Sequence, residues 1–144
     1  MSQSLSVLPH SFVIARLDAQ AVVPAAIWSS QGFLSVSRTD EELSVVCSED
    51  VAVTFDKVDR GWRALKIHGP LQFDQVGILA SLADPLAAAG IGIFAVSTFD
   101  TDYILVKQAT LSAALSALQG AGHEVVGSQI AQAASASRPR RRRL

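Results

Sequence analysis

Between residues 62 and 126 the chain alternates twice between strand-type and helix-type hydrophobic patterns. This order constrains the fold more than any other feature. Residues 62–68 alternate as a strand does, and the period becomes helical from Val76. The remaining elements are strand patterns at 91–96 and 102–106, a helix capped by Thr110, and a last strand at 123–126. The order β-α-β-β-α-β predicts an α+β module of the ferredoxin-like type.

The first of these helices carries a proline inside its pattern. Its apolar face recurs at helical spacing, at Leu79, Leu82, Leu86 and Ala89. Because Pro85 lacks a backbone donor, we expect it to kink the helix or restart it with Asp84 as a new cap. Gly90 predicts the end of the helix, and Gly120 and Gly122 predict the end of the second one.

The first half of the chain predicts a shorter version of the same module. Residues 12–17 read as a strand, residues 24–28 have room for one or two helical turns, and residues 33–47 predict a hairpin. Residues 48–61 are polar and acidic and read as a connector. We therefore expect an abbreviated module with its connector over 1–60, a full module over 61–130 and a disordered, Arg-rich tail over 131–144.

An internal repeat supports this division. Residues 35–46 can be laid on residues 95–106 at an offset of 60, and both segments are strand–turn–strand. The matched pairs include Val36 with Val96, Ser37 with Ser97, Asp40 with Asp100, and Val46 with Val106. Hairpin chemistry alone could produce such a match, so duplication and coincidence both stay open.

Composition excludes several classes of protein. The 144 residues are 49% apolar and 17% charged, which is typical of a globular protein. The single cysteine, Cys47, rules out an intrachain disulfide and favours the cytoplasm, and no histidine lies at metal-ligand spacing from it. Neither a signal peptide nor a membrane-spanning segment is expected. We expect no metal and no cofactor.

The net charge of −1 conceals an uneven distribution. Five arginines fall within the last seven positions, and residues 1–137 carry 7 basic and 13 acidic groups, a net charge of −6. An acidic domain argues against nucleic-acid binding by the folded part. The tail could tether the protein to an acidic partner, although a solvated terminus is the simpler interpretation.

Two segments resemble the central motif of ACT domains. They are Asp74-Gln-Val-Gly-Ile-Leu79 and, after the helix, Ala89-Gly-Ile-Gly-Ile93. With the hairpin segments 35–47 and 97–103, the chain is similar to small bacterial tandem ACT-domain proteins, and in module type to the cytosolic arginine sensors of animals. Val76 departs from the motif, since many ACT domains have proline there. The resemblance spans about residues 10–126 and implies a regulatory protein that binds an amino acid where modules meet.

The residues also point to a ligand site at the first helix of the second module. Backbone N–H groups of Gly77, Ile78 and Leu79 at a helix start could hold a carboxylate, beside Val76. Asp74 could attract an ammonium group, although it could equally be a simple helix cap. Ser97 and Thr98, at a strand end, are candidates for neutral hydrogen bonds, with Ser37 and Arg38 as their counterparts in the first module. Turn chemistry is the competing explanation for this second cluster.

Nothing in the sequence assembles a catalytic constellation, so we expect a protein that is not an enzyme. The expected function is non-catalytic sensing of a small ligand, an amino acid. The alternative is a protein–protein interaction module with a vestigial ligand site. Unequal coverage of the sheet faces favours a homodimer, and a protein partner fits the second interpretation. We expect Cys47 to be buried and inert, His68 to be structural, and Trp28 and Trp62 to lie in the core or an interface.

Overall fold

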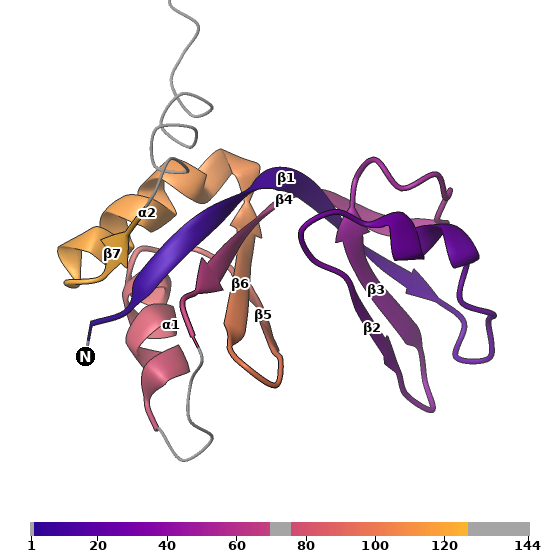
Figure 1. Ribbon diagram of the computed structural model, residues 1–144, viewed down its shortest axis with the longest axis horizontal. Coiled ribbons are helices and arrows are strands. Elements are labelled where there is room, and N and C mark those ends of the chain that lie inside the picture. The colour runs from indigo at the N-terminus through magenta and orange to yellow at the C-terminus, as the bar shows by residue number, and fades with distance from the viewer. Residues whose placement is uncertain (1, 70–75, 127–144) are drawn as a thin grey trace, which may run out of the picture. The chain divides into compact units, whose positions relative to one another are not determined.

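The computed structural model describes residues 2–69 and 76–126, which divide into two compact units. The smaller unit is the stretch His10–Trp62, and the larger unit contains the described residues up to Pro9 and from Arg63 onward. Strands β1 (Ser4–Leu17) and β4 (Lys57–Ile67) supply residues to both units (Figure 1). Residues 2–9, expected from the sequence in the first module, lie in the unit of the second.

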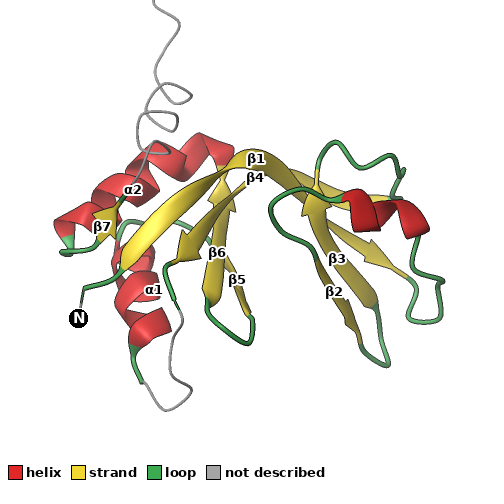
Figure 2. Cartoon of the chain, in the orientation of Figure 1, coloured by secondary structure: helices red, strands yellow, loops and turns green. Residues whose placement is uncertain are grey.

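The larger unit follows the predicted β-α-β-β-α-β order. Its elements are the end of β4, α1 (Ile78–Ala88), β5 (Phe94–Ser97), β6 (Asp102–Lys107), the short 3-10 helix η2 (Gln108–Thr110), α2 (Leu111–Gly120) and β7 (Glu124–Val125). The strands are arranged β7–β1–β4–β6–β5, and the start of β1 runs parallel to β7. The predicted α+β, ferredoxin-like order is confirmed, with one unpredicted strand segment inserted beside β4 (Figure 2).

Both helices of the larger unit cover the same face of its sheet. Alternate residues of the strands point into one buried cluster with residues of both helices. The cluster contains Leu5, Val7, Leu65, Ile67, Ile104 and Val106 from strands, Leu82 and Leu86 from α1, and Leu111, Ala114 and Leu118 from α2. The strand residues share one face because they alternate, and the helix residues share one face because they recur every three or four positions.

The two helices end in the same motif. Gly90 adopts a left-handed backbone with φ of 75°, its N–H donates to the carbonyl of Ala87, and the N–H of Ile91 donates to the carbonyl of Leu86. The stop predicted at Gly90 is confirmed. In α2 the equivalent glycine is Gly122, with φ of 96°.

Two predicted caps are wrong. Asp84 does not begin a new helix, because α1 runs from Ile78 to Ala88 without interruption. Thr110 precedes α2, but its hydroxyl donates to the carbonyl of Lys107 and makes no capping bond. The 3-10 helix η2 leads directly into α2, so Thr110 is not preceded by the extended backbone of an ordinary N-cap.

A histidine explains why Pro85 does not break α1. In a regular helix the N–H of residue 85 would donate to the carbonyl of Ser81, but proline has no N–H. That carbonyl instead accepts a hydrogen bond of 2.8 Å from Nε2 of His123. The ring's Nδ1 accepts from the N–H of Gln3 at 3.0 Å, so the tautomer with the proton on Nε2 satisfies both bonds. His123 is only 5% exposed, and its ring joins Ser81 of α1 to Gln3, which precedes β1.

The smaller unit has a reduced set of elements. They are the remainder of β1, the 3-10 helix η1 (Ala25–Ser29), β2 (Ser35–Arg38), β3 (Leu43–Ser48) and the start of β4. Its separate core contains Val13, Ala15, Ile27, Val45, Cys47, Val51 and Phe55. The short helical segment and the hairpin are confirmed. The connector predicted over 48–61 is wrong at its end, since β4 begins at Lys57. The first side chains of β4 are mostly exposed, so they do not show the alternation of apolar and polar residues that predicts a strand.

The two hairpins repeat one hydrogen-bonding pattern, but at an offset of 59 rather than 60. In each, a threonine N–H donates at 2.8 Å to the carbonyl three residues on, Thr39 to Glu42 and Thr98 to Thr101. In each, the threonine hydroxyl accepts from the N–H of that same later residue. Because Thr98 lies 59 positions after Thr39, the counterparts of Ser97 and Thr98 are Arg38 and Thr39, not Ser37 and Arg38.

None of the helices among the described residues is long and apolar enough to cross a membrane. The predicted tail over 131–144 lies outside the described residues.

Candidate functional site

The predicted site at the start of α1 is described from Val76 onward. Gly77 precedes the helix with φ of 80° and ψ of 2°, a left-handed conformation that a residue with a Cβ adopts only with strain. No side chain of the described residues caps the helix at Gly77. Ile78 turns inward and is 5% exposed, whereas Val76 is 81% exposed. Asp74 lies outside the described residues.

This geometry suits an anion. The first bond of the helix runs from the N–H of Ser81 to the carbonyl of Gly77, so the N–H groups of residues 78–80 have no acceptor within the helix itself. The macrodipole adds partial positive charge at the same point. Leu79, with 36% exposure, is the side chain that would border a bound group.

The second predicted cluster lies at the tip of the β5–β6 hairpin and makes turn hydrogen bonds. The hydroxyl of Ser97 donates to Oδ1 of Asp102 at 2.6 Å. The hydroxyl of Thr98 donates to the carbonyl of Thr101 at 3.0 Å. Since both hydroxyl protons are committed, these oxygens can offer only lone pairs to a ligand without breaking the turn. They therefore suit an ammonium group better than a carboxylate.

A buried threonine ties this hairpin to the strand that leads toward α1. Thr101 is 6% exposed, and its hydroxyl donates at 2.6 Å to the carbonyl of Ile67, the last residue of β4. Figure 1 shows the hairpin tip and the start of α1 at the same end of the larger unit. The fold thus places the two predicted clusters at one end, with Thr101 fixing the hairpin to β4.

The other singled-out residues have mainly structural positions. Cys47 is fully buried, and this burial raises the pKa of its thiol, with the charge of Asp50 adding to the effect. His68 bonds with the hydroxyl of Ser6. Trp28 is 69% exposed, so of its two expected places the core is excluded and an interface stays a prediction. Among the described residues no three His, Cys, Asp or Glu side chains are grouped to hold a metal ion.

Two features of the described residues were not predicted. Arg63 is a buried arginine, 5% exposed, which donates to Oε1 of Gln108 and to the carbonyl of Leu8, both at 3.0 Å. Burial lowers the pKa of its guanidinium. The smaller unit also contains a pocket where the sequence suggests only a strand end and a connector. Its lining comes from residues 16–21 and 54–57, which no local pattern brings together.

Comparison with protein families matches most of the chain to two models. The model described as the ACT domain matches residues 57–120. A second model, an N-terminal domain, matches residues 10–53. The division between the two matches falls in the loop that precedes β4.

Among curated proteins, the cytosolic arginine sensor for mTORC1 subunit 1 of Homo sapiens is 36% identical over 90 residues. The sensor of Bos taurus gives the same identity. The alignment covers 62% of this chain and 27% of the sensor, so the chain spans about a quarter of the length of these relatives.

Among solved structures, a protein from Agobacterium tumefaciens superposes with a TM-score of 0.81 at 43% identity, covering 88% of this chain and 93% of that one. The ligand-free regulatory subunit of aspartate kinase from Thermus thermophilus superposes with a TM-score of 0.59 at 12% identity, covering 82% and 96%. At that identity the second likeness concerns the fold alone.

Proposed function

Since this chain belongs to the ACT-domain proteins, we propose that it is a non-catalytic regulatory protein that senses an amino acid in the cytoplasm. The observation that carries the proposal is the left-handed Gly77 at the start of α1, at the same end of the unit as Ser97 and Thr98. The arginine-sensing relatives support the same class of function.

The proposed binding mode divides the ligand between two sets of groups. The N–H groups of Gly77, Ile78 and Leu79 hold the α-carboxylate, next to Val76. Asp74 and the lone pairs of Ser97 and Thr98 attract the ammonium group. This assignment follows from the committed hydroxyl protons of the hairpin and from the positive end of the helix.

Calorimetry on wild type and Asp74→Asn, with an amino acid found by screening, tests the mode. Loss of one charge-assisted bond should weaken binding by about 10- to 150-fold, while the melting temperature changes little because asparagine also caps helices. Asp84→Asn is the matched control, since Asp84 is an exposed carboxylate on α1 itself. Equal affinities for wild type and Asp74→Asn would indicate that Asp74 is a helix cap and does not bind the ligand.

A protein–protein interaction module is the second candidate. Val76 and Phe99, which flank the proposed site in sequence, are 81% and 79% exposed, and exposed apolar side chains of this kind favour an interface. Failure of every amino acid to stabilise the protein would favour this alternative, with the helix start as a vestige of a ligand site.

A further inference from the structure

The smaller unit contains a pocket that is separate from the proposed site in the larger unit. It has a volume of about 290 Å³ and lies where β1 ends and β4 begins. Its wall includes Leu17 and Ala21, from the end of β1 and the turn that follows, and Thr54 and Phe55, from the segment that precedes β4. Small-molecule sites start at about 300 Å³, so a ligand here would have the size of an amino acid rather than a nucleotide.

Charged groups without partners surround this pocket. Asp18, Asp56 and Lys57 line it and all are exposed, and none of these three side chains has a hydrogen bond or ion pair with another described residue. Phe55, 8% exposed, is an apolar residue of the same lining. The pocket lining therefore includes two carboxylates and one ammonium group whose side chains are available to a ligand.

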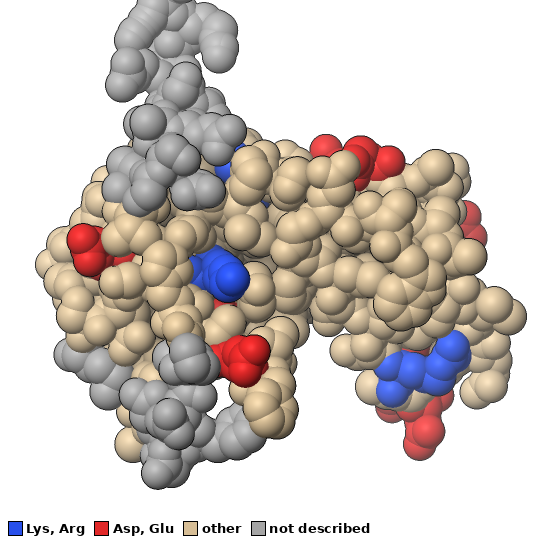
Figure 3. Space-filling model, in the orientation of Figure 1, with Lys and Arg blue, Asp and Glu red and all other residues tan. Residues whose placement is uncertain are grey.

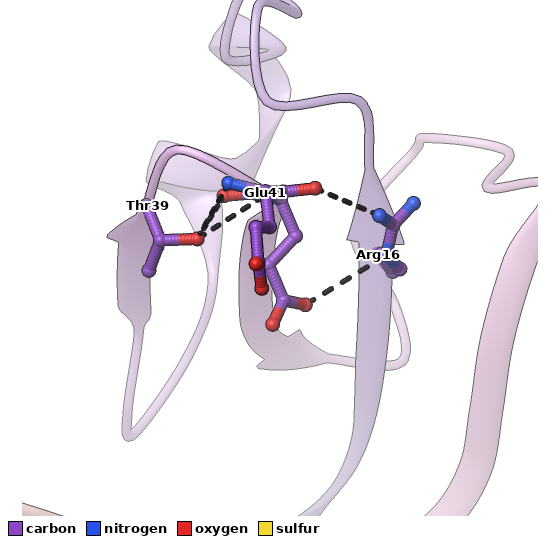
Figure 4. A network of polar contacts seen from close by, with 4 residues as sticks. Arg16, Thr39 and Glu41 are labelled. Atoms are coloured by element: carbon purple, nitrogen blue, oxygen red, sulfur yellow. Dashed lines mark hydrogen bonds and ion pairs between the residues drawn. The ribbon is translucent and has the colours of Figure 1, made fainter.

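The rim of the pocket is held in place by arginines. Arg38 donates to the carbonyls of Ala19 and Ala21, which fixes the turn that follows β1. Arg16, a lining residue, donates from Nη2 to the carbonyl of Glu41 at 2.8 Å and lies 3.9 Å from the carboxylate of Glu42 (Figure 4). Figure 3 shows basic and acidic side chains adjoining one another at this hairpin. A rim fixed before binding reduces the ordering cost of a ligand.

The turn that binds Arg16 is itself held by hydrogen bonds. The hydroxyl of Thr39 accepts the N–H groups of both Glu41 and Glu42 at 3.1 Å. With Arg16 largely committed to this turn, the free charges that remain in the pocket are those of Asp18, Asp56 and Lys57.

The geometry points to a second binding site here, for a basic α-amino acid. Lys57 would take the carboxylate, while Asp18 and Asp56 would take the α-ammonium and the cationic end of the side chain. The aliphatic part of the ligand would lie against Phe55. This site does not depend on the proposed site at Gly77, because every residue that lines it belongs to the stretch His10–Trp62.

A titration of the ¹⁵N-labelled protein tests the inference by NMR. With L-arginine as the probe, saturable shifts are expected at the backbone amides of Asp18, Ala21, Asp56 and Lys57. Agmatine, which lacks the carboxylate, should bind more weakly than L-arginine because it leaves Lys57 unused, and L-glutamate should cause no saturable shifts there. Shifts confined to residues 76–79 would overturn the inference. So would the absence of any shift up to about 10 mM L-arginine, a concentration well above the Kd expected of a functional site.

Variants that each remove one charge test whether L-arginine binds in this pocket. Asp56→Asn should weaken the binding of L-arginine by about three- to tenfold, since the pairs are partly exposed to solvent. Asp40→Asn, an exposed carboxylate on the hairpin outside the pocket, is the matched control and should bind as wild type does. Equal weakening by both variants would mean that general electrostatic attraction, not this pocket, accounts for the shifts. Asp74→Asn should leave these shifts unchanged, so failure here is distinguishable from failure at Gly77.

Discussion

Replacement of His123 by leucine tests how α1 accommodates Pro85. The imidazole donates to the carbonyl of Ser81 at 2.8 Å and accepts from the N–H of Gln3 at 3.0 Å. Leucine retains apolar volume but leaves both backbone groups without a partner in a site that is 5% exposed. At about 1–2 kcal/mol for each partly buried group, the free energy of unfolding should fall by about 2–4 kcal/mol.

A double-mutant cycle with Pro85→Ala isolates the part that belongs to the helix. Alanine at position 85 restores the N–H that a regular helix donates to the carbonyl of Ser81. In that background His123→Leu should cost about 1 kcal/mol less than in wild type, because only the N–H of Gln3 loses its partner.

Urea unfolding followed by circular dichroism measures the free energy of unfolding of wild type, His123→Leu, Pro85→Ala and the double variant. His68→Leu is the control, since His68 is exposed and its ring bonds, among the described residues, to the hydroxyl of Ser6, and it should change stability by less than about 0.5 kcal/mol. Costs of His123→Leu that agree within about 0.5 kcal/mol in the two backgrounds would refute the substitution of His123 for the missing donor.

Three further outcomes are expected. Gly77→Ala should lower stability by about 1–2 kcal/mol in thermal unfolding, because φ is 80° there; an unchanged melting temperature would contradict the left-handed conformation. Burial raises the pKa of Cys47, so the thiol's contribution to stability is complete below the unfolded pKa of about 8.5 and is lost as pH rises beyond it. Between pH 8 and pH 10, a range set by that value, wild type should therefore lose more stability than Cys47→Ala, and parallel pH profiles would argue against it. Sedimentation at micromolar concentration should show a homodimer, since β5 lies at the edge of the sheet; a clean monomer would contradict pairing through that edge.

Local periodicity was sufficient to predict most of the larger unit. The apolar residues of α1, α2, β5 and β6 recur at the spacing of a helix or a strand, so short segments of sequence are enough to predict each of these elements and their order. The first strand segment was missed because its partner is remote. Ser4 pairs with Glu124 and Leu5 with Val125, and no local pattern reports a partner 120 positions away.

Pro85 shows a different limit of prediction. By itself a proline within a helical pattern predicts a break, and the donor that compensates for it comes from His123, 42 positions away. The repeat illustrates the same point on a smaller scale. Residue identities favoured an offset of 60, whereas the hydrogen bonds of Thr39 and Thr98 define 59.

The candidate site was predictable in part. Glycine before a helix and polar residues at a strand end are sequence signals, and Gly77, Ser97 and Thr98 were found from them. Their places at a helix start and a strand end are observed, while the ligand roles of Gly77, Ser97, Thr98 and Asp74 all stay predictions. The pocket of the smaller unit could not be predicted, because its wall joins residues 16–21 to residues 54–57 across the sheet.

A thermal-shift screen of the twenty amino acids tests the proposed sensing function most directly. A ligand that binds only the folded protein stabilises it by about 2.7 kcal/mol at a concentration one hundred times its Kd, which corresponds to a rise of several degrees in Tm. The proposal predicts such a rise, growing with concentration, for at least one amino acid. No change with any of the twenty at millimolar concentration would contradict amino-acid sensing and favour the interaction module.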